Sequence, residues 1–513
     1  MLRAAVNLLR LFLIARTLAQ HDALFPLEQL GVAPGIMVLV RLISRRSAPG
    51  RPGQRLAAAC EALGPTFIKL GQALSVRSDL VGEEVAADLS ALQDQLPPFP
   101  SDQARGIIEE EFGMPLDQLF DHFESDSIAA ASIAQVHFAT TTDGRDVAVK
   151  VLRPGVAARL AKDIDLMLWV ARLVERAHPP FRRLKPVEVV RTFQETVRLE
   201  MDLRLEAAAA VELATNFEDD PDLRVPAVDW ERTSRRVLTT ERIEGIRIDE
   251  VAALVDAGLD PADIIERSAR VFFYQVFRDG FFHADMHPGN MFIGPDGGLM
   301  PVDFGIMGRL DRKTRNYLAD MLLAFLQQDY RRVADVHFQA GYVPAHKSRE
   351  SFMQAARSIG EPLFGKPLEQ ISLARLLAQM FQVTEQFEME TQPQLLLLQK
   401  TMLVAEGVSR KLDPGVNMWV LSEPLIEEWM RANRGPEARI RDMTETALLQ
   451  IERLPGLLDR LDQASRMIEE GGVRLHPDTV EAFRAGDRNL WPAVIAAVAA
   501  AAVTVLVVLA LAG

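Results

Sequence analysis

The stretch that most constrains this chain runs from His283 to Asn290 and is followed by Asp303-Phe304-Gly305. It places Asp285 five residues before Asn290, and a second Asp thirteen residues after Asn290. Phosphoryl transfer from ATP needs an Asp near the attacking oxygen, together with an Asn and an Asp that hold Mg²⁺. Polar loop residues that cap a helix are the alternative, but two motifs in this order and at this spacing favour phosphoryl chemistry.

A second nucleotide-binding signal is Val147-Ala148-Val149-Lys150, which lies at the end of a predicted strand. It matches the V-A-I-K strand of protein kinases, whose Lys meets the α- and β-phosphates of ATP and a helix Glu. The H-x-D-x-x-x-x-N spacing matches the catalytic loop of the same enzymes. A surface lysine at a strand end is the alternative, but the accompanying motifs favour a nucleotide role for Lys150. The sequence therefore predicts ATP and Mg²⁺ as cofactors.

Turn and periodicity signals organise the middle of the chain. Asp143-Gly144 separates the apolar runs 136–139 and 147–152 and predicts a β-hairpin. Ser101 is expected to be the N-cap of a helix. Further helices are predicted near 155–177 and 187–215, and short strands near 225–229 and 235–241.

The segment just before the hairpin departs from the usual kinase pattern. Ordinary kinases cover the phosphates with a G-x-G-x-x-G loop. Here the segment is rich in alanine, which lacks the access of glycine to positive φ, so a stiffer phosphate loop is expected. A helix terminus rich in Ala is the alternative, but it would not explain the place of this segment directly before the hairpin. The residues of this Ala-rich segment are Ala129, Ala130, Ala131, Ser132, Ile133, Ala134 and Gln135.

A carboxylate is needed to pair with Lys150, and the predicted helix 187–215 offers three. Asp202 and Glu206 are four residues apart and share a helix face, whereas Glu200 lies about 120° from Glu206 at roughly 3.6 residues per turn. The three acids therefore cannot all serve as the ion-pair partner of Lys150. Surface acids on an exposed helix are the alternative interpretation.

Composition narrows the class of protein. The length of 513 residues suggests about two to four domains, and 48% hydrophobic with 25% charged residues suits packed cores. A net charge of -14 argues against a nucleic-acid partner. The one cysteine, Cys60, cannot form an intrachain disulfide, so a reducing compartment and a buried apolar role for its side chain are expected.

An uncharged apolar stretch runs from Trp491 to Ala512. At about 1.5 Å per residue it can cross a hydrocarbon core of roughly 30 Å as one helix. A buried core helix is the alternative, but the length favours a transmembrane helix. Arg484 and Arg488 precede the stretch, so the positive-inside rule keeps the upstream domain in the cytoplasm, where ATP is present.

The N-terminal residues leave membrane contact open. Arginines interrupt the apolar residues too often for a signal peptide. Four apolar residues fit one helix face, either of a membrane-surface helix or of a helix packed on the body; they are Val6, Leu9, Leu13 and Ile14. Further arginines could meet anionic lipid or form a solvated linker; they are Arg41, Arg45, Arg46, Arg51 and Arg55.

Taken together, these segments and Lys69-Leu70-Gly71-Gln72 resemble the UbiB family of atypical kinase-like proteins, over roughly residues 50 to 420. The resemblance implies an α+β fold, an atypical two-lobed protein-kinase-like fold with an N-terminal helical extension and a C-terminal transmembrane helix. It also implies a function in ubiquinone (coenzyme Q) biosynthesis at the membrane. ATP and Mg²⁺ binding with ATPase activity, rather than ordinary protein-kinase activity, would follow.

The resemblance carries roles onto particular residues. Lys150 would be the nucleotide lysine and Glu206 its ion-pair partner. Asp285 would be the catalytic-loop Asp, while Asn290 and Asp303 would bind Mg²⁺.

Two further groups of residues receive roles in the same way. Glu200 and Asp202 would hold Lys69 of the K-x-G-Q helix, which would lie over the active site as a regulatory element; Gln72 belongs to the same motif. The adenine would meet the segment 240–243, through backbone groups of residues such as Glu241 and Ile243.

The expected domains are an amphipathic, membrane-proximal segment (1–50), a helical extension with K-x-G-Q (51–124), an N-lobe (125–245), a C-lobe (246–415), a helical tail (416–489) and an anchor (490–513). Expected partners are membrane lipid, polyprenyl phenol precursors of ubiquinone and other proteins of ubiquinone biosynthesis, at the bacterial inner (cytoplasmic) membrane. ATP turnover would handle lipid precursors or organise biosynthetic enzymes. A nucleotide-sensing binding module and a small-molecule phosphotransferase are the alternatives.

Overall fold

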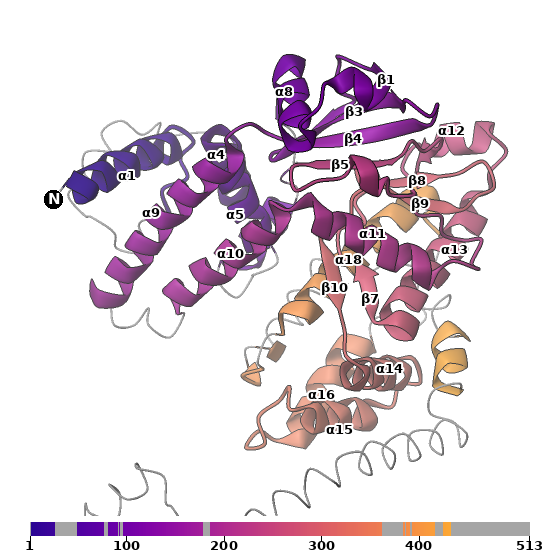
Figure 1. Ribbon diagram of the computed structural model, residues 1–513. Coiled ribbons are helices and arrows are strands. Elements are labelled where there is room, and N and C mark those ends of the chain that lie inside the picture. Colours follow the sequence, from indigo (N-terminus) through magenta and orange to yellow (C-terminus); the bar gives the residue numbers. More distant parts are fainter. Residues whose placement is uncertain are drawn as a thin grey trace, which may run out of the picture. The chain divides into compact units, whose positions relative to one another are not determined.

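The computed structural model describes a large part of the chain (Figure 1). The described residues are 2–25, 49–75, 81–90, 92, 96–177, 185–361, 383–384, 386–389, 392–415 and 424–431. The chain divides into two compact units, Met1–Met430 and Arg431–Gly513. The predicted transmembrane stretch and most of the predicted helical tail lie outside the described residues. No helix within the described ranges combines the length and apolar character needed to cross a membrane.

A five-stranded antiparallel sheet forms the first part of the kinase-like body. Its strands are β1 (Phe120–Phe123), β2 (Ala129–Ala130), β3 (Ala134–Thr141), β4 (Asp146–Leu152) and β5 (Val237–Glu241). The order is β1-β3-β4-β5, with β2 paired to β3. The predicted β3–β4 hairpin is confirmed, and its register places Lys150 opposite Val136. The first strand, β1, precedes the boundary at residue 125 that the sequence suggested.

Helices cover the two faces of this sheet, because alternate residues of β4 point to opposite sides. Val147, Val149 and Val151 pack with helix α8 (Ser101–Phe112), which lies over β3 and β4 in Figure 1. Leu152 belongs to a second core cluster, with residues of three helices. These helices are α9 (Val156–Ala177), α10 (Pro186–Glu200) and α11 (Leu203–Asn216).

The predicted single helix 187–215 is wrong, because the chain forms α10 and α11 with a break between them. Asp202 adopts an extended conformation (φ -128°, ψ 92°), and its side chain accepts a hydrogen bond from the backbone N–H of Arg204. It is therefore the N-cap of α11, a position that Asp favours. Met201, directly before it, is buried in the core of the sheet and helices. The buried side chain of Met201 anchors the chain at this point, and Asp202 starts a new helix. Together they interrupt the predicted helix.

Two smaller predictions also fail. The expected strand at 225–229 is only an isolated bridge between Val228 and Thr240. Pro226, which has no N–H to donate to a ladder, explains why a longer strand does not form. Ser101 is the first residue of α8 rather than its cap, and the N-cap position is held by Pro100 without a side-chain hydrogen bond.

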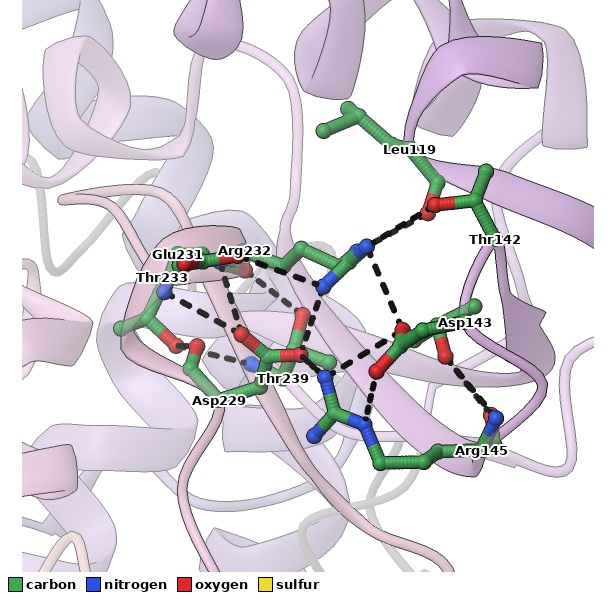
Figure 2. A network of polar contacts seen from close by, with 10 residues as sticks. Leu119, Thr142, Asp143, Arg145, Asp229, Glu231, Arg232, Thr233 and Thr239 are labelled. Carbon is green, nitrogen blue, oxygen red and sulfur yellow. Dashed lines mark hydrogen bonds and ion pairs between the residues drawn. The ribbon is translucent and has the colours of Figure 1, made fainter.

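A buried arginine fixes the turn of the β3–β4 hairpin against β5 (Figure 2). Arg232, in the 3₁₀ helix η3 (Trp230–Arg232), donates to the carbonyl of Leu119 at 2.9 Å and to Asp229 at 2.9 Å. Its side chain also reaches the hydroxyl of Thr142 at 3.1 Å, in the turn of the hairpin. Arg145 adds a contact to Asp229 at 2.8 Å. The hairpin that carries Lys150 is thus held at its turn as well as along its length.

The N-terminal helices share a separate core. They are α1 (Leu2–Gln20), α4 (Pro52–Leu63), α5 (Pro65–Ser75) and α7 (Glu83–Ser90). Ala15, Ile68 and Cys60 are buried in this core, and burial raises the pKa of the Cys60 thiol to about 12. The buried role expected for Cys60 is confirmed.

Of the four residues predicted to form the apolar face of α1, Ile14 packs against the N-terminal core and the other three do not. Val6, Leu9 and Leu13 are all exposed. Two of the arginines that were expected to meet anionic lipid or form a solvated linker make ion pairs. Arg51 pairs with Asp88, and Arg55 lies 3.5 Å from a carboxylate oxygen of Asp22.

The second part of the body is mainly helical. Its helices are α12 (Val251–Asp256), α13 (Pro261–Phe273), the π-helix η4 (Tyr274–Asp279), the 3₁₀ helix η5 (Pro288–Asn290), α14 (Arg312–Leu326), α15 (Tyr330–Ala340), α16 (Arg349–Gly360) and α18 (Pro393–Leu412). Short strands lie between them: β6 (Ile246–Arg247), β7 (Phe281–His283), β8 (Met291–Ile293), β9 (Leu299–Pro301) and β10 (Met307–Arg309). The pairs β7–β10 and β8–β9 bracket the two motifs that carry the expected chemistry.

Candidate nucleotide-binding and catalytic site

Lys150 is the central cation of the candidate site. It lies on β4 between neighbours on β3 and β5, so two strands fix its backbone. Its Nζ atom is 2.6 Å from Oε1 of Glu206, in the first turn of α11, and 3.0 Å from Oδ2 of Asp303. The structure therefore brings together three residues that the sequence placed 56 and 153 positions apart.

The charges of this cluster support one another. Burial would lower the pKa of Lys150, but Asp303 and Glu206 outweigh it and raise that pKa above its ordinary value. Burial would raise the pKa of Asp303, yet the charge of Lys150 and the N–H of Gly305 hold it below its usual range. For Glu206 the effect of burial is larger than that of the nearby Lys150, so the pKa of Glu206 is raised. Asp303 is thus the more strongly ionised of the two acids.

His283 connects the catalytic loop to the D-F-G segment. Its Nε2 lies 2.5 Å from the carbonyl oxygen of Asp303, and its Nδ1 accepts a hydrogen bond from the N–H of Asp285 at 3.2 Å. Burial lowers the pKa of this imidazole, so the neutral ring is favoured. A neutral ring with its hydrogen on Nε2 satisfies both contacts. His283 therefore holds Asp285 and Asp303 in a fixed relation.

Asn290 and Asp303 offer oxygen atoms that suit Mg²⁺. The side-chain N–H of Asn290 donates to the carbonyl of Asp285 at 3.2 Å, which leaves the amide oxygen as its acceptor. The N–H of Val302 donates to the carbonyl of Asn290 at 3.0 Å, so the chain beside Asp303 is tied to the loop. A carboxylate and an amide oxygen are hard ligands, and Mg²⁺ commonly takes few protein ligands beside phosphates and water. The donor set fits the expected metal.

The K-x-G-Q helix is α5, and it reaches this cluster. Nζ of Lys69 lies 3.2 Å from a carboxylate oxygen of Glu200, and both side chains are largely buried. Burial would raise the pKa of Asp303, and the charge of Lys69 adds to the opposing effect of Lys150 and Gly305, which lower it. The side-chain oxygen of Gln72 is buried and accepts no hydrogen bond from the described residues.

Asp202 caps α11 and pairs with Arg204, while its role toward Lys69 stays a prediction. Its carboxylate accepts hydrogen bonds from the guanidinium of Arg204 at 2.8 Å and 2.7 Å, in addition to the N-cap contact. The hydrogen bonds from Arg204 lower the pKa of Asp202.

The Ala-rich segment comprises β2, a short turn at residues 131–133 and the first residues of β3. The N–H of Ala131 donates to the carbonyl of Ala134 at 2.8 Å, and Arg153 donates to the carbonyl of Ala131 at 2.8 Å. Gln135 is buried, and its side chain contacts both the N–H and the carbonyl of Phe99. That side chain is engaged in holding the preceding segment, and the backbone of Gln135 lies in β3 between β2 and β4.

The predicted adenine segment lies at the end of β5. The N–H of Glu241 donates to the carbonyl of Ala227 at 2.8 Å, and its carboxylate is 2.5 Å from the guanidinium of Arg224. These contacts engage the donor and the side chain of Glu241. The segment then continues through Ile243, which leads into the second part of the body.

Lys400 is a site residue that the sequence interpretation missed. Its Nζ donates to Oδ1 of Asp285 at 2.9 Å, from helix α18 and across 115 positions of sequence. The sequence around it reads as an apolar helix, and no motif marks the lysine. Only the fold brings it to the catalytic loop.

The fold and this arrangement of residues define a kinase-like protein, with a strand lysine, a helix glutamate, an H-x-D-x-x-x-x-N loop and a D-F-G segment. Residues 91–337 match the ABC1 atypical kinase-like domain, and residues 356–417 match the UbiB helical domain. The chain belongs to the UbiB family of atypical kinase-like proteins.

Relatives named "Probable protein kinase UbiB" align over most of their length. The chain is 43% identical to the protein of Marinobacter nauticus, over 91% of this chain and 86% of the relative. It is 43% identical to a protein of Vibrio cholerae, over 89% and 85%. The identity with the protein of Azotobacter vinelandii is 44%, over 83% and 79%.

Proposed function

We propose that this protein is an atypical kinase-like ATPase that binds Mg-ATP and supports ubiquinone biosynthesis. The observation that carries the proposal is the position of Lys150, which contacts Glu206 and Asp303 at once. Kinases use the same contact from strand to helix to hold a lysine where it meets the α- and β-phosphates.

The other residues supply the remaining parts of phosphoryl transfer. Asp285 would orient the attacking water or hydroxyl, since its loop is held through His283. Asn290 and Asp303 would hold Mg²⁺, which would neutralise charge on the β- and γ-phosphates. The buried, charged surroundings of Lys150 strengthen each of these electrostatic contacts relative to water.

The position of the K-x-G-Q helix favours a small or lipid-like substrate over a protein. Lys69 of α5 influences Asp303 and pairs with Glu200, so α5 lies beside the candidate site. A helix in this place would hinder a protein segment from reaching Asp285. ATP turnover would instead support the handling of polyprenyl phenol precursors or the assembly of other proteins of ubiquinone biosynthesis. The exposed apolar residues of α1 and the predicted anchor at 491–512 support an action at the cytoplasmic membrane.

A nucleotide-sensing module is the second candidate, and one observation favours it. In this structure Lys400 pairs with the carboxylate of Asp285, the group that would orient the attacking oxygen. A protein that binds nucleotide but hardly hydrolyses it would retain the Lys150 cluster, while the ion pair with Lys400 would keep Asp285 from the attacking oxygen.

ATP hydrolysis by the purified full chain tests the proposal directly. The assay uses Mg²⁺, with and without vesicles that contain a polyprenyl phenol. We expect turnover that rises with the lipid and falls at least about a hundredfold in Asp285→Asn, because general base and orienting groups contribute on that order. The exposed Asp256, at the end of α12, gives a matched Asp256→Asn control that keeps turnover. Tight nucleotide binding without turnover under any condition would favour the sensing module instead.

A further inference from the structure

Helix α18 delivers a cation to the catalytic loop from far along the chain. It begins at Pro393, which suits the first turn of a helix, and ends with basic residues in its last turn, which suits the C-terminal end. Leu398, Val408 and Leu412 pack in the same core as residues of α13 and β7. This packing fixes the helix, and Lys400 then lies with its Nζ atom 2.9 Å from Oδ1 of Asp285.

The catalytic loop itself supplies no basic side chain of this kind. The residues between Asp285 and Asn290 are Met286, His287, Pro288 and Gly289, and none is Lys or Arg. The one imidazole among them, that of His287, accepts a hydrogen bond from the N–H of Gly289 at 3.1 Å and is exposed. The positive charge at Asp285 therefore comes from α18.

Lys150 and Lys400 mark two ends of the candidate site. Lys150 is engaged by Glu206 and Asp303, at the position that meets the α- and β-phosphates. Asp285 belongs at the attacking oxygen, next to the terminal phosphate. Phosphoryl transfer depends on cations around that phosphate, and some enzymes supply one from another segment of their own chain. Lysine suits this role, because it is a compact charge on a flexible stem.

We propose that Lys400 recognises the terminal phosphate of bound ATP, and that its contact with Asp285 is the position it holds before nucleotide arrives. This inference rests on the proposed function, in that it requires the site to bind Mg-nucleotide. It assigns to α18, within the segment that matches the UbiB helical domain, a direct part in distinguishing ATP from ADP.

The side chains of this pair can be changed without removing a core contact. The side chain of Lys400 is 21% exposed and that of Asp285 is 30% exposed. Met keeps the long apolar stem of the lysine that packs beside the loop, so a folded Lys400→Met protein is expected. Lys400→Arg retains the charge. Lys411, on the same helix, is 62% exposed and lies 3.8 Å from Asp249, so Lys411→Met is the matched control.

The test compares affinities for Mg-ADP and for a non-hydrolysable Mg-ATP analogue, measured by calorimetry on the full chain. In Lys400→Met we expect the analogue to bind about tenfold more weakly, as for the loss of one charge-assisted contact, while ADP affinity stays within about twofold. Lys400→Arg should recover part of the loss. Lys411→Met should match the parent with both ligands.

Equal losses for the analogue and ADP, or no loss for either, would overturn the inference. Tighter analogue binding together with faster hydrolysis in Lys400→Met would also overturn it, because Lys400 would then restrain Asp285. This comparison does not require turnover. If the parent protein binds ATP but does not hydrolyse it, only the proposed ATPase activity is contradicted. A parent that binds neither ligand defeats both.

Discussion

Lys150 contacts two carboxylates at once, and the two respond to burial in opposite ways. Asp303 keeps its charge, since Lys150 and the N–H of Gly305 outweigh burial, whereas the pKa of Glu206 is raised because its burial is not fully offset. A lysine between unequal acids is well placed to exchange one of them for phosphate oxygens, which Lys binds as a point charge. At the scale of residues the site is thus prepared for an anion.

Asp303 leads to an expected pH dependence of stability. Burial would raise its pKa, but Lys150 and Gly305 depress it in the folded protein. A depressed carboxyl pKa stabilises the fold above the unfolded-state value of about 3.9, and this contribution is lost as the pH falls toward the folded-state pKa. Below about pH 4, the free energy of unfolding should therefore fall less steeply in Asp303→Asn than in the parent.

Urea unfolding at a series of pH values measures this difference without any nucleotide. Asp256→Asn, at an exposed position, supplies the control for the substitution itself. Identical slopes for Asp303→Asn and the parent in the acid range would mean that Asp303 is not held in its charged form by its neighbours.

At the scale of elements, the pairing of β7 with β10 fixes the position of the catalytic loop, because the loop begins at the end of β7. Gly280 precedes β7 with φ +67°, and its carbonyl accepts the N–H of Leu310 at 2.8 Å. A Cβ atom there would lie 2.5 Å from the carbonyl oxygen of Leu310. Both the backbone conformation and the close packing require glycine at this position.

Two matched substitutions separate these causes. Gly258, after α12, has φ +81° with no heavy atom within 4 Å of its Cβ position. Gly258→Ala should cost about 1–2 kcal/mol of stability from conformation alone. Gly280→Ala should cost about 1–3 kcal/mol more, from the clash with a backbone that must shift. Urea unfolding checks both, and equal costs would show that β7 and β10 separate easily.

At the scale of the whole described molecule, Asp163 of α9 joins the N-terminal helices to the kinase-like body. Its carboxylate accepts a hydrogen bond from the hydroxyl of Thr66 on α5 at 2.6 Å and lies 2.5 Å from Arg10 of α1. The helix that carries Lys69 is therefore held to α9 by the same group that holds α1. A displacement of α1 would therefore disturb the contact between Asp163 and Thr66 of α5.

Removal of this carboxylate should loosen the whole assembly. Asp163→Ala leaves Thr66 and Arg10 without their common partner, so we expect a loss of about 1–3 kcal/mol. Asp165→Ala, two positions along the same helix and exposed, should change stability by less than about 0.5 kcal/mol. Thermal and urea unfolding distinguish the two, and a harmless Asp163→Ala would mean that the apolar core alone holds these helices together.

The kinase-like elements could be predicted because their signals are local. A turn at Asp143-Gly144, alternating valines in β4 and the fixed spacing of the His283–Asn290 loop each depend on a few neighbouring residues, whose stereochemistry limits the backbone. The hairpin and the place of Lys150 on its second strand followed directly. The strand expected at 225–229 failed because Pro226 removes a donor, a signal that was present and went unused.

Only the tertiary structure decided which distant charges meet. Residue spacing left three acids open for Lys150, and packing of α11 against the sheet selected Glu206 while the helix break turned Asp202 to Arg204. Lys400 carries no local signal, and it reaches Asp285 because α18 is buried against α13. Local sequence limits backbone geometry over a few residues, whereas an ion pair across a hundred positions depends on how whole elements pack.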